Sequence, residues 1–190
     1  MTMAEMVPID SAGKHTELDS RLAEARMPPS AADEAYAIRI RSDGVWTYHG
    51  SPIERPALVK LFASVLRRDD DGDYWLITPA ERGRITVDDA PFIAVDVAVE
   101  GQGAEMSLTF RTNLGEVVVA GPDRPIRVTV DEATCSPRPY VLVRDGLEAL
   151  ISRPVFYALA DLAVEQEGVP GVWSLSQFFA LDRPSTGPAD

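Results

Sequence analysis

The sequence predicts an α+β fold in which a strand-turn-helix-strand motif occurs twice, with a largely antiparallel β-sheet segment joining the two copies. The first observation is a repeat: residues 53–61 (IERPALVKL) and 151–159 (ISRPVFYAL) share Ile, Arg, Pro and Leu at equivalent positions. The second is that Trp75 and Trp173 lie equally far beyond these two segments. The third is an alternation of apolar and polar residues between the copies, which is typical of half-buried strands.

The two ends of the chain are expected to lie outside this fold. Residues 1–34 are polar and contain Pro28 and Pro29, which predicts a mostly disordered segment with one short, loosely docked helix over residues 16–26. Residues 184–190 (PSTGPAD) predict a disordered tail. This leaves a first α+β half with the central strands at 35–122, and a second half with the repeated motif at 123–183.

The first copy begins with a short strand over residues 45–48 and a turn at His49–Gly50, because Gly readily adopts positive φ. Pro56 suits the first position of a helix. Arg67 and Arg68 would form the last turn of this helix. The apolar residues that define it recur at helical spacing: Leu58, Leu61, Phe62, Val65 and Leu66. A turn at 69–72 and a strand over 74–78 follow.

The central segment predicts a series of strands, at 85–87, 92–99, 106–111, 117–120 and 126–130. Residues 112–115 read as a hairpin loop. Alternation within 92–99 predicts that one face of this strand carries Ile93, Val95, Val97 and Val99.

The second copy follows the same order as the first. It has a strand over 140–143, a turn at Asp145–Gly146, a helix opened by Pro154, and a strand over 172–178.

Several motifs together resemble the bacterial domain-of-unknown-function family 1285, over about residues 43–182. They are D-G-x-W-x-Y-x-G-x-P-I at 43–53, L-I-T-P-x-E at 76–81, V-D-D-A-P-F at 87–92 and G-V-W-S at 171–174. One departure is Ser176, near which the family pattern expects Gly. The resemblance implies a repeated α/β motif and a ligand-binding or signalling role suggested only by analogy, with no catalytic residues to carry over.

Composition excludes several classes of function. The 190 residues include 30 Asp and Glu against 18 Lys and Arg, a net charge of −12, which disfavours nucleic-acid binding. One cysteine, Cys135, and two histidines exclude an internal disulfide and a His-rich metal site. The Asp69–Asp73 run lacks the spacing of an EF-hand. We therefore expect no metal and no cofactor. Because the sequence shows no leader and no long apolar stretch, we expect a cytoplasmic protein without membrane contact.

The candidate ligand-binding residues centre on two arginines, each directly before a proline that opens a helix. Arg55 and Arg153 could join free helix N–H groups in binding a small anion, or they could form internal ion pairs, for example with Glu81, Asp88 or Asp89. The whole candidate set is Arg55, Glu81, Arg111, Asn113, Arg153 and Trp173.

Alternative roles exist for the other members of this set. Arg111 and Asn113 would offer donors at a hairpin tip, although turn chemistry also explains Asn113. Trp173 would line a pocket between the halves or belong to the core.

These residues lead to three hypotheses about function. The leading one is a non-catalytic ligand-binding or regulatory protein with a cleft between its halves that takes a small anion. The second is a homodimeric interaction module that uses exposed sheet surface. The third is an enzyme that uses carboxylates such as Asp89 or Asp96, although Asp96 is expected to pair across strands with Arg111 or Arg127.

Overall fold

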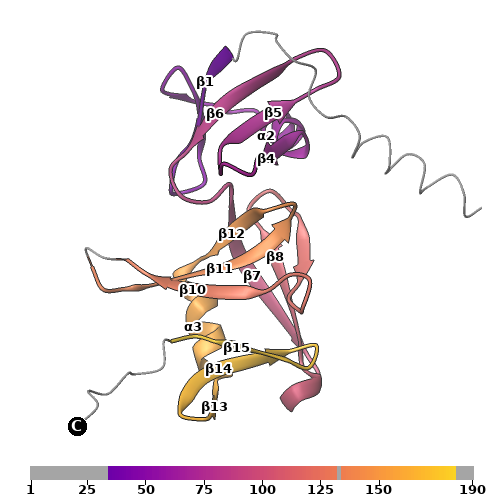
Figure 1. The fold of residues 1–190 in the computed structure, drawn as a ribbon, viewed down its shortest axis with the longest axis vertical. Helices are drawn as coiled ribbons and strands as arrows, with labels where there is room; N and C mark the ends of the chain where they lie inside the picture. The colour runs from indigo at the N-terminus through magenta and orange to yellow at the C-terminus, as the bar shows by residue number, and fades with distance from the viewer. Residues whose placement is uncertain (1–33, 132–133, 183–190) are drawn as a thin grey trace, which may run out of the picture. The chain divides into compact units, whose positions relative to one another are not determined.

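The computed structural model describes residues 34–131 and 134–182 (Figure 1). The predictions for residues 1–33 and 184–190, including the helix over 16–26, lie outside the described residues. In the described part, strands predominate: three β-sheets accompany two nine-residue helices, α2 (Pro56–Ser64) and α3 (Arg153–Asp161), and the 3-10 helix η1 (Gly103–Glu105). The predicted α+β class is therefore wrong, and the fold is mainly β.

The first sheet has six strands in the order β3-β2-β1-β6-β5-β4. Its strands are β1 (Glu34–Ile40), β2 (Trp46–Tyr48), β3 (Ser51–Pro52), β4 (Leu66–Arg68), β5 (Tyr74–Ile77) and β6 (Arg82–Val87). All neighbours are antiparallel except β1 and β6, which run parallel.

The second sheet also has six strands, in the order β10-β11-β12-β7-β8-β9. Its strands are β7 (Phe92–Glu100), β8 (Ser107–Thr112), β9 (Val117–Val119), β10 (Ile126–Val130), β11 (Pro137–Arg144) and β12 (Leu147–Ile151). The parallel pair here is β7 with β12. A third, three-stranded sheet consists of β13 (Val164–Gln166), β14 (Val169–Ser174) and β15 (Gln177–Ala180).

The predicted repeat of a strand-turn-helix-strand motif is wrong at the level of topology. The strands after α2 lie in the same sheet as the strands before it, whereas the strands after α3 form a separate sheet. The local signals were correct: Pro56 begins α2, and His49–Gly50 and Asp145–Gly146 all have positive φ. Sequence similarity over nine residues thus specified a helix start, but strand pairing beyond it depends on distant partners.

The end of the first predicted helix also differs. α2 ends at Ser64, and the next residues form β4, where Leu66 pairs with Leu76 and Arg68 with Tyr74. The apolar spacing that predicted a longer helix is satisfied by a strand, because Leu66 is fully buried in this pairing.

A bulge changes the predicted face of β7. The register between β7 and β8 shifts between Ala94 and Asp96, so the alternation of side chains is interrupted there. Phe92 and Ala94 are fully buried, whereas Val95 is 45% exposed. The prediction that Ile93, Val95, Val97 and Val99 share one face is therefore wrong, because the bulge separates Ile93 from Val97 and Val99 in the alternation.

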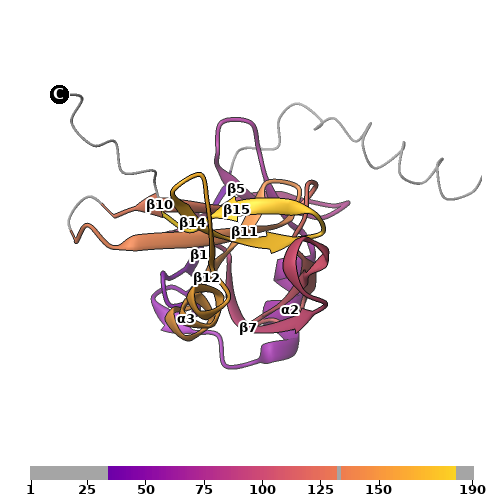
Figure 2. The ribbon, with the colours of Figure 1, turned by 90° about the horizontal axis from the view of Figure 1, so that it is seen from below.

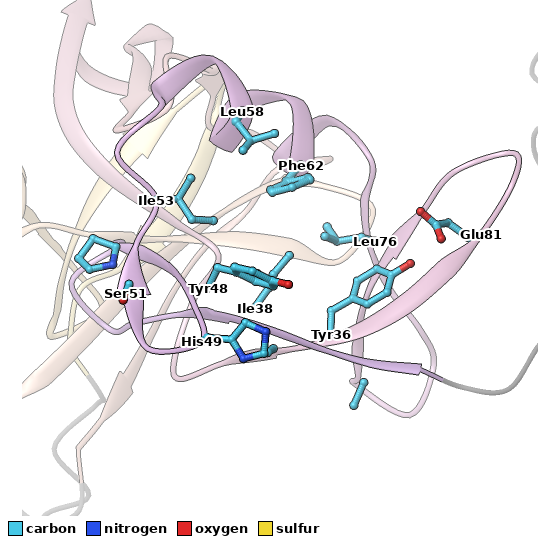
Figure 3. A pocket seen from close by; sticks show the side chains of 13 residues that line it. Tyr36, Ile38, Tyr48, His49, Ser51, Ile53, Leu58, Phe62, Leu76 and Glu81 are labelled. Atoms are coloured by element: carbon cyan, nitrogen blue, oxygen red, sulfur yellow. The ribbon is translucent and has the colours of Figure 1, made fainter.

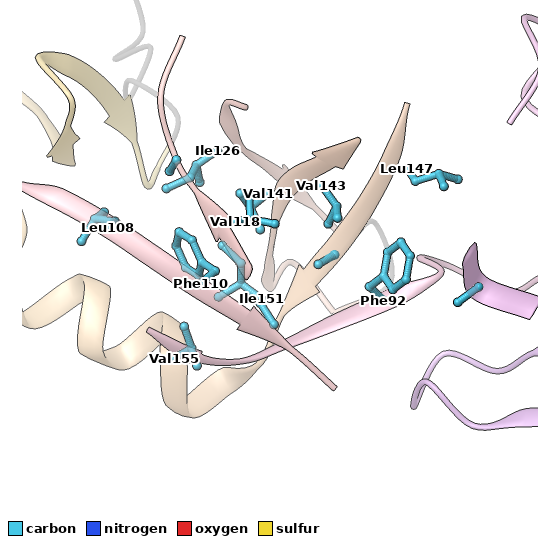
Figure 4. Close-up of a cluster of buried hydrophobic side chains, with 14 of the residues drawn as sticks. Phe92, Leu108, Phe110, Val118, Ile126, Val141, Val143, Leu147, Ile151 and Val155 are labelled. Carbon is cyan, nitrogen blue, oxygen red and sulfur yellow. The ribbon is translucent and has the colours of Figure 1, made fainter. Parts of the chain in front are cut away.

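The core of the second sheet contains the largest fully buried side chains (Figure 4). Phe92, Leu108, Phe110, Val141 and Leu147 each have no exposed surface. The alternation predicted for β8 is confirmed by Leu108 and Phe110. α3 packs against β7 and β14, so it contacts both the second and the third sheet (Figures 1 and 2). Neither helix of the described residues is long and apolar enough to cross a membrane.

Candidate functional site

A pocket of about 730 Å³ lies between α2 and the first sheet (Figure 3). Its sheet side comes from β1, β2 and β5: Ala35, Tyr36, Ala37, Ile38, Tyr48 and Leu76. The strand β3 supplies Ser51 and Pro52, the helix α2 supplies Leu58 and Phe62, and the connecting segments supply the rest: His49, Ile53 and Glu81. Most of these side chains are aliphatic or aromatic, so the pocket is chiefly apolar.

The pocket exists because a short helix covers a wide sheet. Nine helical residues span about 14 Å, and a helix is roughly 10 Å wide. Six strands at about 4.8 Å spacing span about 24 Å. α2 buries Val59 and Ala63, and its Phe62 stacks on Trp46 with ring centroids 6.3 Å apart. Leu58 and Phe62 stay half-buried at the boundary of the covered area, where they line the pocket.

A glycine on β6 shapes one wall. Gly83 is buried beside Tyr36, and a Cβ atom built on Gly83 would lie 2.3 Å from two ring carbons of Tyr36. The missing side chain therefore lets the Tyr36 ring lie directly against the backbone of β6. Figure 3 shows this ring at the edge of the pocket, with its hydroxyl turned toward the carboxylate of Glu81.

Glu81 ends the tight connection between β5 and β6. The Thr78 backbone N–H donates to the Glu81 carbonyl oxygen (2.9 Å), and the Thr78 hydroxyl accepts from the Glu81 N–H (3.1 Å). These bonds fix the backbone from which the Glu81 side chain extends to the pocket. Among the described residues, no ion pair joins Glu81 to a cation.

A second aromatic pair forms the opposite part of the wall. The rings of Tyr48 and His49 meet edge to face with centroids 4.3 Å apart. The backbone N–H of His49 donates to the Ala37 carbonyl oxygen at 2.8 Å, which holds the β2–β3 turn against β1. Tyr48 remains 53% exposed and thus accessible to a ligand.

Of the six residues that the sequence singled out, Glu81 alone lines this pocket. Arg55 is the N-cap residue of α2 and Arg153 the first residue of α3, so the two arginines lie on different helices, and both are exposed. Among the described residues, neither Arg55 nor Arg153 forms the alternative ion pair: Asp88 pairs with Arg39 (2.6 Å), Asp89 pairs with Arg138, and Glu81 has no ion pair.

The other three residues have structural partners. Arg111 pairs with Asp96 across β7 and β8 at 2.9 Å, as one of the sequence alternatives predicted. Asn113 pairs with the backbone of Ile93: its N–H donates to the Ile93 carbonyl (2.8 Å), and its Oδ1 accepts from the Ile93 N–H (3.0 Å). Trp173 is half-buried on β14 and meets Phe178 edge to face at 5.4 Å.

Sequence reasoning missed a polar cluster around Tyr140, which is buried on β11. The Tyr140 hydroxyl donates to Asp89 Oδ1 at 2.7 Å, and Arg138 donates both to Asp89 and to the Tyr140 oxygen. The guanidinium of Arg127 lies 4.3 Å from the centre of the Tyr140 ring. Burial raises the pKa of Tyr140, and its hydrogen bond to Asp89 raises that pKa further.

Ion pairs limit a catalytic role for Asp89 and Asp96, the two carboxylates considered for an enzyme. Asp89 has committed both oxygens to Arg138 and Tyr140, and Asp96 is held by Arg111, whose hydrogen bond lowers the pKa of Asp96 despite slight desolvation. Neither carboxylate lines the pocket.

Sequence reasoning also missed the apolar lining of the pocket. One signal was available. The buried stripe of α2 is formed by Val59 and Ala63, and Leu58, Leu61 and Phe62 are apolar residues in addition to that stripe. Tyr36 and Tyr48 gave no signal, because the antiparallel pairing of β1 with β2 brings these two strands together, and no local pattern in the sequence specifies it.

Comparison with known proteins yields two family models and two solved structures. The model described as "Domain of unknown function (DUF1285), N-terminal domain" matches residues 26–90, and the model "Protein of unknown function (DUF1285), C-terminal domain" matches residues 91–181. None of the curated proteins matches the chain.

Both solved structures are crystal structures of DUF1285 family proteins. The one from Silicibacter pomeroyi DSS-3 is 47% identical, with a TM-score of 0.76, and the match covers 86% of this chain and 93% of that chain. The one from Shewanella baltica OS155 is 29% identical, with a TM-score of 0.53, and the match covers 66% of this chain and 91% of that chain. Because the family models cover nearly all of the described residues, the chain belongs to the DUF1285 family.

Proposed function

We propose that the protein is a non-catalytic binding module, and that the pocket between α2 and the first sheet binds a small ligand with an apolar body. The observation that carries this proposal is the pocket itself, whose volume of about 730 Å³ lies within the range typical of small-molecule sites. Aliphatic and aromatic side chains from β1, β2 and α2 face it, so burial of an apolar ligand surface would drive binding.

The lining supports a ligand different from the small anion expected from the sequence. None of the described residues that line the pocket is Lys or Arg, and Glu81 contributes a negative charge. An anion site at Arg55 and Arg153 stays a prediction that is separate from this pocket. We propose no catalysis, because Asp89 and Asp96, the acids considered for an enzyme, lie elsewhere and are paired with arginines.

The test uses two leucines on the same helix. Leu58 lines the pocket, whereas Leu61 is 59% exposed and does not. The neutral dye N-phenyl-1-naphthylamine, which becomes fluorescent in apolar surroundings, is titrated into the full chain and into the variants Leu58→Glu and Leu61→Glu. We expect saturable fluorescence with the wild type and with Leu61→Glu, and a severalfold loss of affinity with Leu58→Glu.

The two variants place the same charge on the same helix, Leu61→Glu at an exposed position and Leu58→Glu at a half-buried one. Circular dichroism of both variants therefore serves as the control for folding. A dye that binds equally to both variants, or that fails to bind the wild type, would refute the proposed pocket.

A further inference from the structure

We infer that the ligand of this pocket carries a cationic group, such as a primary ammonium, on its apolar body, and that Glu81 recognises that group. This inference rests on the proposed binding function and specifies its ligand class. Three features of the described residues support it: an acid without an ion-pair partner, aromatic rings in the same pocket, and the absence of basic lining residues.

The first feature is the position of Glu81. Its side chain lines an otherwise apolar pocket, and the backbone from which it extends is held by the Thr78 hydrogen bonds. The cations nearest in sequence are engaged elsewhere: the Arg82 guanidinium lies 5.2 Å from the centre of the Trp75 ring, and Arg84 pairs with Asp73 at 2.8 Å. The carboxylate is therefore available to a ligand.

The second feature is the aromatic wall. Tyr36 and Tyr48 line the same pocket, and the electron-rich face of a phenol ring attracts ammonium groups. The Tyr36 hydroxyl points toward Glu81 in Figure 3, so an ammonium group placed between them would meet a carboxylate and a hydroxyl oxygen together. An ammonium has three N–H donors, which these acceptors can satisfy.

The third feature is the absence of Lys and Arg from the described residues that line the pocket. A ligand carboxylate at this end of the pocket would lie beside Glu81 without a compensating Lys or Arg among the described lining residues. Like charges at close range repel. A neutral hydroxyl would be tolerated but would gain no ionic interaction. The order of affinity is thus amine, then alcohol, then acid.

The test compares three ligands that share an indole body: tryptamine, tryptophol and indole-3-propionate. Binding to the full chain is measured by calorimetry at pH 7 and low salt. Because Glu81 is exposed, we expect tryptamine to bind about fivefold more tightly than tryptophol, the upper range for an exposed ion pair. Indole-3-propionate should bind more weakly than either, and added salt should reduce the advantage of the amine.

Two variants decide whether Glu81 is responsible. Glu81→Gln removes the charge at the pocket, and Glu54→Gln removes the same charge from an exposed residue just before α2 that does not line it. We expect the amine and the alcohol to bind equally to Glu81→Gln, and the amine preference to persist in Glu54→Gln.

Two negative results are distinguishable. If tryptophol binds, but tryptamine has no advantage or keeps its advantage in Glu81→Gln, the cationic specificity is wrong and the pocket stands. If none of the three indoles binds and the dye also fails, both proposals are wrong.

Discussion

At the scale of single residues, Ser174 joins the third sheet to the second. It is fully buried at the end of β14, where its hydroxyl donates to the Ala120 carbonyl (2.7 Å) and accepts from the Leu108 N–H (3.0 Å). Ser174→Ala leaves both backbone groups without their partner, so we expect the free energy of unfolding to fall by about 1–3 kcal/mol. Urea unfolding measures this change.

Ser42 provides the matched control for this prediction. It is exposed, and Ser42→Ala should leave the urea midpoint unchanged. A Ser174→Ala variant as stable as the wild type would mean that the hydroxyl contributes nothing to joining the sheets.

Tyr140 predicts a dependence of stability on alkaline pH. Its pKa in the folded protein is raised above the ordinary value of 10.0, first by burial and then by the bond to Asp89. The folded state therefore keeps the phenol protonated after the unfolded chain has begun to ionise. The resulting stabilisation is complete below pH 10 and is lost as the pH rises through the folded pKa.

We expect the free energy of unfolding of the wild type to fall when the pH rises from 9 to 11, and the fall to be smaller in Tyr140→Phe. Part of it should remain, because burial also raises the pKa of Tyr74. Denaturant titrations at several pH values measure both slopes. Equal slopes in the two proteins would contradict this account of Tyr140.

Residue partners were predictable where they lie on neighbouring strands. The Asp96–Arg111 pair followed from adjacent strands around one hairpin and is confirmed. Ser174 and Ala120, or Tyr140 and Asp89, are more than fifty residues apart in sequence, and their contacts depend on how whole sheets pack. No local pattern in the sequence contains that information.

At the scale of elements, four hairpins within residues 34–131 and 134–182 use two-residue turns with positive φ at both positions, the geometry that matches strand twist. Three of these turns have glycine at the second position: His49–Gly50, Asp145–Gly146 and Glu167–Gly168. The fourth turn is Leu175–Ser176, which has no glycine. Ser176 has φ 62°, so its side chain imposes strain that glycine avoids.

We expect Ser176→Gly to raise the free energy of unfolding by about 0.5 kcal/mol, because relief of strain exceeds the added entropy of the unfolded chain. Thermal unfolding measures the gain. The reverse change, Gly168→Ser, tests the same principle at φ 79°, where no atom lies within 4 Å of an added Cβ. It should cost about 1 kcal/mol from backbone strain alone. A Ser176→Gly variant that melts at a lower temperature would contradict the argument.

Element types were predictable where the pattern was purely local. The turns at Gly50 and Gly146 and the strand β8 are confirmed. β4 and the bulge in β7 were not predictable, since Leu66 and Val95 obtain their surroundings from strand register rather than from their neighbours in sequence. The same applies to the pocket: Glu81 was singled out, but the walls formed by Tyr36 and Phe62 come from three separate elements.

At the scale of the whole molecule, Arg144 connects the regions matched by the two family models. Its guanidinium donates to the Ala63 carbonyl at the end of α2 (2.8 Å) and to Glu116 (3.2 Å). The last carbonyls of a helix favour a cation. Since the described residues of the two regions belong to one compact unit, we expect the regions to unfold together.

Far-UV circular dichroism and tryptophan fluorescence should therefore report one coincident urea transition. Trp46 and Trp75 report on the first region and Trp173 on the second. Arg144→Leu should move the whole transition to lower urea while the two signals remain coincident. A fluorescence change that precedes the loss of circular dichroism would show that the regions unfold separately.

The homodimer, the second hypothesis drawn from the sequence, stays a prediction. Val117 is 61% exposed on β9, an edge strand of the second sheet, and contact with a second copy would cover it. Light scattering on the full chain decides: a mass that remains at 20.7 kDa at every concentration would exclude the dimer.

The two parallel strand pairs have a consequence for the order of events in folding. Hairpins such as β11–β12 close over a few residues and form within about 1–10 μs in general. The β1–β6 and β7–β12 pairs instead join strands that are separated by several intervening elements. Each of these pairings requires the closure of a long loop. The chain loses conformational entropy on closure before the strand contacts form and stabilise the pair. We therefore expect these two pairings to be the late, rate-limiting steps by which the preformed hairpins become sheets.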